Sequence, residues 1–115
     1  MAKPIPKRFG EIVKRYEGNP IITRDNVDFD CAHIFNAGAI KYRDNCLLLL
    51  RVQARDKKSH LVKATSEDGI NFKIPNKYAF SPSRNFRLDD KGVEDPRITR
   101  MDGLYFVTYT AYSTF

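Results

Sequence analysis

The sequence predicts an all-β protein built from successive antiparallel units, and three observations support this class. Hydrophobic residues make up 42% of the 115 residues and charged residues 30%, as in a soluble globular domain. The 8 Phe and 6 Tyr fall in alternating runs, which strands favour. Tight turns separate these runs, and a hairpin pattern occurs twice along the chain. Short antiparallel strands joined by tight turns are typical of β-propeller blades.

A short helix is expected before the strands. Between residues 9 and 16 the apolar residues repeat with the spacing of one helix face, and Gly18 and Pro20 end the pattern. Residues 1–18 are therefore predicted to form an N-terminal arm with a short helix, and residues 19–115 a partial β-propeller. The residues of the predicted apolar face are Phe9, Ile12, Val13 and Tyr16.

Residues 35–74 are predicted to form the first blade. Arg43 and Asp44 make a two-residue turn inside a hairpin, and Asp68-Gly69 marks a second tight turn. The second arm of the hairpin is apolar on both faces, which indicates a strand that is covered on both sides. The four predicted strands of this blade are residues 35–42, 45–52, 60–65 and 70–74.

Residues 93–112 are predicted to open a second blade. Residues 75–92 are polar and contain prolines, as a long connection would. A strand over residues 93–100, a turn at Met101-Asp102-Gly103 and a strand over residues 104–112 then repeat the hairpin.

Composition also narrows the classes of function. The formal net charge is +6, but the basic residues are scattered, so nucleic-acid binding ranks third among the functions considered. No apolar run is long enough to cross a bilayer, and the N-terminus lacks the pattern of a secretory signal. Cys31 and Cys46 lack the spacing of metal ligands. A cytoplasmic protein without metal, cofactor or membrane partner is therefore expected.

The candidate site centres on Asp95, which lies between Glu94 and Pro96 at the start of a predicted strand. Asn36 lies near the start of the corresponding strand of the first blade, and in a propeller such inner strands line the central channel. Arg51 ends a four-leucine run, where burying a guanidinium is costly unless a polar site receives it. These residues are predicted to meet in one pocket.

The order of motifs along the chain resembles the N-terminal part of glycoside hydrolase family 130, a family of β-mannoside phosphorylases and related β-mannosidases. The resemblance covers residues 15 to 115 and rests on the motifs taken together. They are Asn19-Pro20-Ile21, Phe35-Asn36-Ala37-Gly38-Ala39, Leu48-Leu49-Leu50-Arg51-Val52, residues 64–72, residues 92–99 and residues 109–113.

The resemblance implies a five-bladed β-propeller that performs inverting phosphorolysis of β-1,4-mannosides to mannose 1-phosphate. It implies that Asp95 is the proton donor and that Asn36 and Arg51 hold the mannosyl unit, with Glu94 and Arg97 as supporting residues. It further implies that, in the phosphorylases, the proton of the acid can travel through a sugar hydroxyl before it reaches the glycosidic oxygen. The implied partners are a β-mannoside oligosaccharide and inorganic phosphate.

Several alternatives stay open at this point. Inverting hydrolysis normally needs a second carboxylate, whereas phosphate is already nucleophilic, so a single acid with neighbouring cations favours phosphorolysis over a β-mannosidase. A non-catalytic carbohydrate-binding or structural fragment is a further alternative. Asp95 alone could be a turn residue, Arg51 and Arg97 structural ion-pair partners, and Asn36 a strand-end hydrogen-bonding residue.

Family members are much longer than this chain. The 115 residues are therefore expected to be an incomplete, inactive portion, and whether they form an enzyme by themselves is left open. Uncovered strand edges would favour self-association or addition of the rest of the propeller.

Overall fold

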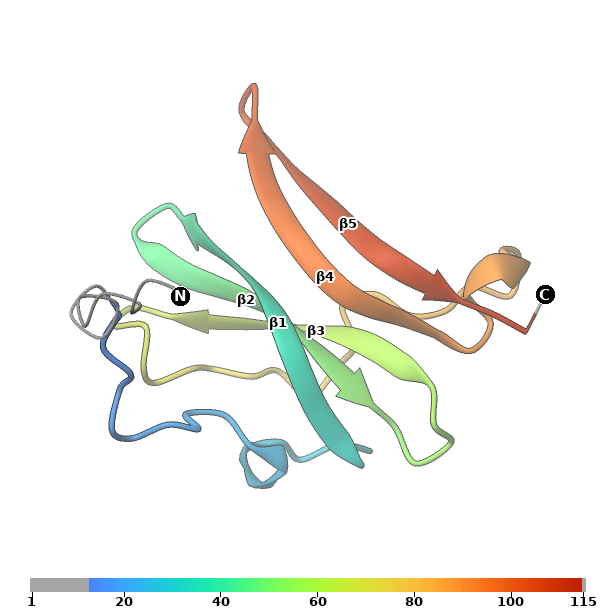
Figure 1. The fold of residues 1–115 in the computed structure, drawn as a ribbon, viewed down its shortest axis with the longest axis horizontal. Helices are drawn as coiled ribbons and strands as arrows, with labels where there is room; N and C mark the ends of the chain where they lie inside the picture. The colour runs from blue at the N-terminus through green and yellow to red at the C-terminus, as the bar shows by residue number, and fades with distance from the viewer. Residues whose placement is uncertain (1–12, 115) are drawn as a thin grey trace, which may run out of the picture.

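The structure, a computed structural model, describes residues 13–114. It contains a five-stranded mixed sheet and two 3₁₀ turns, η1 (Arg24–Asn26) and η2 (Arg87–Asp89). The strands follow one another in sequence order across the sheet. They are β1 (His33–Tyr42), β2 (Asn45–Gln53), β3 (Ser59–Ser66), β4 (Gly92–Met101) and β5 (Leu104–Tyr112) (Figure 1).

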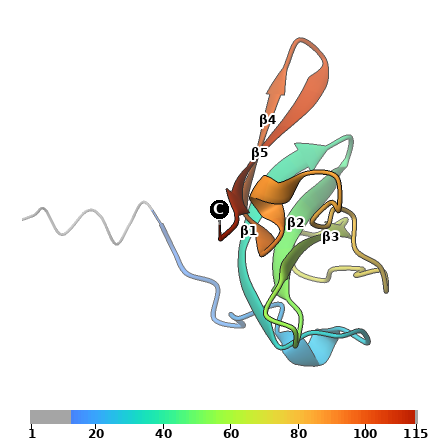
Figure 2. The same cartoon turned by 90° about the vertical axis from the view of Figure 1, so that its right-hand side faces the viewer.

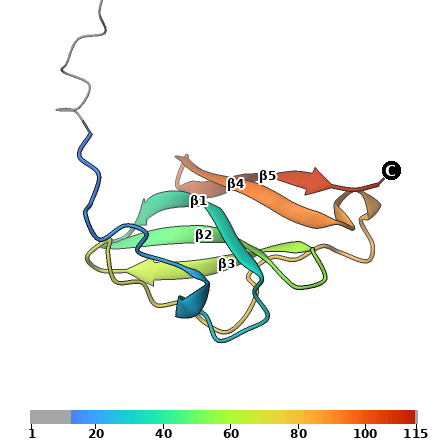
Figure 3. The same ribbon diagram turned by 60° about the horizontal axis from the view of Figure 1, so that its bottom comes forward.

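The sheet consists of two antiparallel units that meet at one point. β1, β2 and β3 form a meander, and β4 and β5 form a hairpin. A single parallel bridge, between Ser59 and Gly92, joins β3 to β4. The β4–β5 hairpin therefore swings away from β3 and lies across β1 as a second layer (Figure 3). Successive antiparallel units of this kind support a β-propeller architecture.

The main core lies on one face of the meander. Leu50 and Val52 of β2 and Val62 and Ala64 of β3 alternate with residues of the opposite face and are almost fully buried. Cys31 joins this cluster, and burial raises the pKa of its thiol. The segments before β1 and after β3 cover the cluster with Ile22, Val27, Phe29, Phe72, Ile74 and Tyr78.

The opposite face of the meander packs against the β4–β5 hairpin. Gly38 of β1 lies so close to β4 that an added Cβ would stand 2.8 Å from the carbonyl oxygen of Pro96. Farther along, Phe80 and Tyr109 meet edge to face with ring centroids 5.0 Å apart. The far end of the hairpin extends beyond the other strands (Figure 2). Its large side chains Leu104 and Phe106 are exposed. Self-association through uncovered strand edges stays a prediction.

Two expectations about secondary structure are wrong. Val13–Tyr16, the described part of the predicted helix, has no helical structure, while residues 9–12 lie outside the described range. The predicted fourth strand at residues 70–74 is reduced to one isolated bridge between Thr65 and Lys73. A helical spacing of apolar residues does not stabilise a helix that has no surface to pack against.

The described residues 13–114 contain no helix with the length and apolar character that a membrane span requires.

The contact between Gly38 and Pro96 gives a test of how the two units pack. Gly38→Ala should lower the free energy of unfolding by about 1–3 kcal/mol, because the added Cβ pushes against backbone atoms. Ala39→Val at the neighbouring exposed position should change it by less than about 0.5 kcal/mol. Urea unfolding followed by circular dichroism measures both. Equal stability of Gly38→Ala and the wild type would contradict this packing.

The turn after β3 gives a pH-dependent prediction. Hydrogen bonds from the backbone and side chain of Asn71, then from the Ile70 N–H and the Ser66 hydroxyl, lower the pKa of Asp68 below its ordinary 3.8. Because the pKa of Asp68 is lower in the folded than in the unfolded state, its ionised carboxylate stabilises the fold at pH above about 4. This stabilisation is lost as the pH falls through the folded-state pKa. Asp68→Ala should therefore destabilise the protein at pH 7, and this difference should shrink in acid. A difference that stays constant from pH 7 to pH 3 in thermal unfolding would contradict this role.

Candidate active site

Glu94 and Asp95 are adjacent in β4, yet both carboxylates point to the same arginine. In a regular strand, consecutive side chains point to opposite faces of the sheet. The β4–β5 register shifts between Glu94 and Arg97, which is a β-bulge, and Asp95 has a φ of 49°. A bulge re-aims side chains locally, and Asp tolerates the left-handed region better than most residues. The bulge therefore brings the two acids together.

Arg51 of β2 is the cation that both acids contact. Its Nη2 lies 2.7 Å from Glu94 Oε1, and its Nη1 lies 3.0 Å from Asp95 Oδ1. Arg51 shares its face of the meander with Leu49 and Leu61, the face on which β4–β5 packs. This position explains how a guanidinium next to four leucines is accommodated.

Two further residues fix the guanidinium. Arg51 Nε donates to Ser59 Oγ at 3.3 Å, and that hydroxyl donates to Glu94 Oε1 at 3.2 Å. The Phe35 ring lies beneath, with its centroid 4.6 Å from the guanidinium carbon. Sequence reasoning missed both residues. For Ser59, the alternation of side chains along β3 could have indicated a contact with Arg51. It places Ser59 on the same face as Leu61, which pairs with Arg51 across the strands.

Asn36 and Arg97 are not part of this cluster. Asn36 lies in the matching bulge of β1, where the register shifts between Ile34 and Ala37, and its side chain is exposed. By position in the two bulges, Phe35 corresponds to Asp95 and Asn36 to Pro96. Arg97 is also exposed and forms no ion pair with either acid in the described part of the chain.

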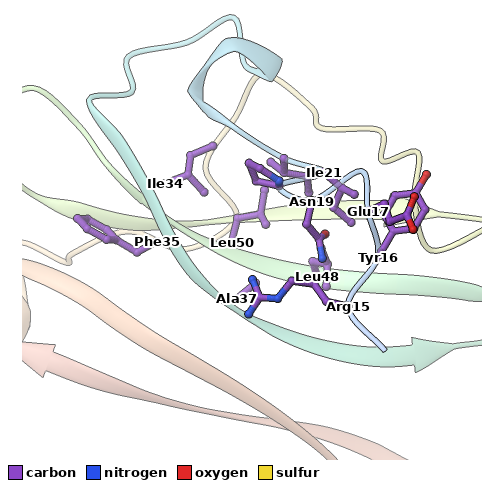
Figure 4. A pocket seen from close by; sticks show the side chains of 12 residues that line it. Arg15, Tyr16, Glu17, Asn19, Ile21, Ile34, Phe35, Ala37, Leu48 and Leu50 are labelled. Carbon is purple, nitrogen blue, oxygen red and sulfur yellow. The ribbon is translucent and has the colours of Figure 1, made fainter. Parts of the chain in front are cut away.

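Phe35 also lines a groove of about 650 Å³ on the other side of β1 (Figure 4). The groove runs between the segment of residues 15–22 and the first two strands. Figure 4 shows Arg15, Tyr16 and Glu17 along one wall, with Ile34 and Leu50 on the strands. Its lining is apolar on the strand side, whereas the segment contributes both polar residues and the apolar Pro20, Ile21 and Ile22.

A second polar cluster lies away from the acids. The His60 ring stacks on Tyr78 with centroids 3.9 Å apart, and its Nδ1 lies 2.9 Å from Ser81 Oγ. Burial lowers the pKa of His60 and raises that of Tyr78. Tyr78 donates to the backbone carbonyl of Asp30 at 3.0 Å. These contacts fasten the loop after β3 to the core.

Part of the Asp95 carboxyl group is accessible to a bound molecule. The Asp95 side chain is 48% exposed, and only its Oδ1 is bonded to Arg51. Within residues 13–114, the side-chain hydrogen bonding of Asp95 uses Oδ1 and leaves Oδ2 for an oxygen atom of a bound molecule. In the same described range, no three His, Cys, Asp or Glu side chains are placed to hold a metal ion.

The ion pairs of Arg51 are testable by comparison with an exposed pair. Arg51→Met should lower the free energy of unfolding by about 2 kcal/mol, because Glu94 is then left mostly buried without its cation. Arg55→Met should cost less than about 0.5 kcal/mol, since Arg55 and Asp30 are 85% and 53% exposed and 3.6 Å apart. Equal losses in denaturant unfolding would contradict a mostly buried Arg51 cluster.

Comparisons with known proteins identify the family of this chain. Residues 3–114 match the family model of glycoside hydrolase family 130, described as β-1,4-mannooligosaccharide phosphorylase. The chain is 34% identical over 110 residues to a 1,2-β-oligomannan phosphorylase of Thermoanaerobacter sp. (strain X514), and the match covers 87% of the chain and 36% of that protein. It is 33% identical over 114 residues to a β-1,2-mannobiose phosphorylase of Listeria innocua, with 87% and 30% covered.

Solved structures give the same result. A glycosyl hydrolase from Bacteroides ovatus superimposes with a TM-score of 0.76 at 29% identity, covering 88% of this chain and 35% of that one. A structure from work on family 130 enzymes that target β-1,2 linkages in Candida mannan has the same TM-score at 31% identity, covering 88% and 34%. The chain spans about a third of the length of these relatives. Because the match to the family model extends over residues 3–114, the chain belongs to glycoside hydrolase family 130.

Proposed function

We propose that this chain carries the proton donor and part of the mannosyl-binding site of a β-mannoside phosphorylase. The observation that carries the proposal is the half-exposed Asp95 carboxyl group, which Arg51 holds through Oδ1. The names of the Thermoanaerobacter and Listeria relatives support phosphorylase chemistry on mannosides.

In the proposed reaction, the Asp95 proton passes to the glycosidic oxygen, directly or through a sugar hydroxyl. The bond between that oxygen and the anomeric carbon breaks as a phosphate oxygen attacks the carbon from the opposite face. The products are mannose 1-phosphate with inverted configuration and a shortened sugar. One protein acid is sufficient because phosphate itself is the nucleophile.

Arg51 and Asn36 are proposed to bind the mannosyl unit. Arg51 Nη1 faces the exposed acid, so a sugar hydroxyl that approaches Asp95 meets the same cation. Asn36 is exposed on the β1 bulge and has its amide available for hydroxyl groups. Glu94 holds Arg51 in place, and Arg97 is proposed to support the site from the other side of Pro96.

We consider two linkages for the phosphorylase and, as a third candidate, a hydrolase. The first is β-1,4, as in the description of the family model. The second candidate is β-1,2, which both named phosphorylase relatives favour. A hydrolase that transfers the mannosyl unit to water is the third candidate, favoured by the similarity to a structure from work on family 130 glycoside hydrolases that target β-1,2 linkages.

The test measures mannose 1-phosphate from β-1,4- and β-1,2-mannobiose with and without phosphate. Two proteins are compared: the 115 residues alone and a chimera in which they replace the matching third of the Thermoanaerobacter phosphorylase. We expect product from the chimera only, and a loss of at least about 100-fold in Asp95→Asn because general acid catalysis contributes that much.

Asp102→Asn is the matched control, since Asp102 lies in the same hairpin with the same φ of 49° and its substitution removes the same charge. Product formation by the 115 residues alone that Asp95→Asn abolishes would overturn the expectation for the isolated chain. Undiminished activity of the Asp95→Asn chimera would overturn the role of Asp95. Free mannose formed without phosphate would favour the hydrolase.

A further inference from the structure

The hydroxyl of Ser59 lies inside the cluster that holds the two acids. Ser59 is 0% exposed, and its Oγ accepts from Arg51 Nε while donating to Glu94 Oε1. Arg51 Nη2 contacts the same Oε1 atom. Ser59, Arg51 and Glu94 therefore form a closed ring of three contacts.

This ring decides which way the guanidinium faces. Two neighbouring donors, Nε and Nη2, are used on Ser59 and Glu94, and a planar guanidinium has its remaining donors in fixed directions. Nη1 is the atom that reaches Asp95. Without the hydroxyl, Nε loses its partner, and the guanidinium is held only by its contacts with Glu94, Asp95 and the Phe35 ring, none of which fixes the direction of Nε.

Ser59 also holds the two units of the sheet together. Its backbone forms the bridge to Gly92, only two residues before Glu94. An added Cβ at Gly92 would stand 3.0 Å from the Ser59 nitrogen and 3.1 Å from its Cβ. Ser59 thus links the β3 backbone to the start of β4 and, through its hydroxyl, the Arg51 side chain to Glu94.

We propose that Ser59 is a positioning residue that orients Arg51 and thereby places the Asp95 carboxyl group. This role rests on the proposed function only in its effect on turnover; the orientation of Arg51 is a property of the chain itself. Ser59 has no exposed surface, so the proposed role acts through Arg51 and not through a direct contact with substrate.

The first measurement is nuclear magnetic resonance of the Arg51 side chain in the 115-residue chain. In the wild type the Arg51 Nε–H should exchange slowly with water, because it is donated to a buried oxygen. Ser59→Ala should raise this exchange rate about tenfold or more. Ser66→Ala is the matched control, since it removes a buried hydroxyl from the same strand that bonds only the Asp68 turn. It should leave the Arg51 signal unchanged.

The second measurement is the kinetics of the chimera. Ser59→Ala should lower kcat about tenfold with little change in KM, because a misplaced acid slows the chemical step more than sugar binding. Ser66→Ala should keep the kcat of the parent chimera. If Ser59→Ala fails to fold, Ser59→Cys keeps the shape of the side chain with a slightly larger and only weakly hydrogen-bonding sulfur, and the same changes in exchange and kcat are expected.

An unchanged Arg51 exchange rate in the folded Ser59 variants would overturn the proposal, whatever the chimera does. Faster exchange with an unchanged kcat would overturn the link to turnover. A chimera that is inactive with the native Ser59 would count against the proposed function, while the exchange measurement would still decide the orientation of Arg51.

Discussion

The arrangement of this protein depends on one guanidinium that satisfies two adjacent carboxylates. Arg51 comes from the first antiparallel unit, and Glu94 and Asp95 come from the second, so the ion pairs cross the line where the units meet. A charge placed among leucines needs such partners, because an unpaired buried ion is strongly destabilising. The β4 bulge supplies both acids on the same side. The ion pairs of Arg51 with both acids therefore depend on the bulge in β4.

Two glycines allow the backbones of the two units to pack closely. Gly38 allows β1 to approach the carbonyl of Pro96, and Gly92 allows β4 to approach Ser59. These close contacts lie on either side of the acids, so the position of Asp95 is linked to backbone packing as well as to Arg51. Because these supports belong to the sheet, the acids are positioned by backbone packing, which suits the proton-donor role proposed for Asp95.

Most of the strands could be predicted from sequence, but the number of strands in the first unit was predicted too high. The hairpins around Arg43 and Gly103 follow from turn residues between alternating runs, a local signal. The helix before Gly18 was wrong where the structure describes it, and the segment at residues 70–74 forms only a bridge, because both depend on packing partners that a local pattern does not reveal. The pairing of Arg51 with the acids was among the alternatives considered from sequence, and the roles of Asn36 and Arg97 stay predictions.

The sequence by itself determined the chemical types at the site: an acid pair before a proline, and an arginine at the end of an apolar strand. It also determined the family, through the order of its motifs. Only the tertiary structure decided that Glu94 and Asp95 share one face, that Ser59 and Phe35 complete the setting of Arg51, and that Asn36 lies outside it. The physical reason is that a bulge and a positive φ reverse the side-chain alternation, and nothing in the spacing of residues records such a reversal.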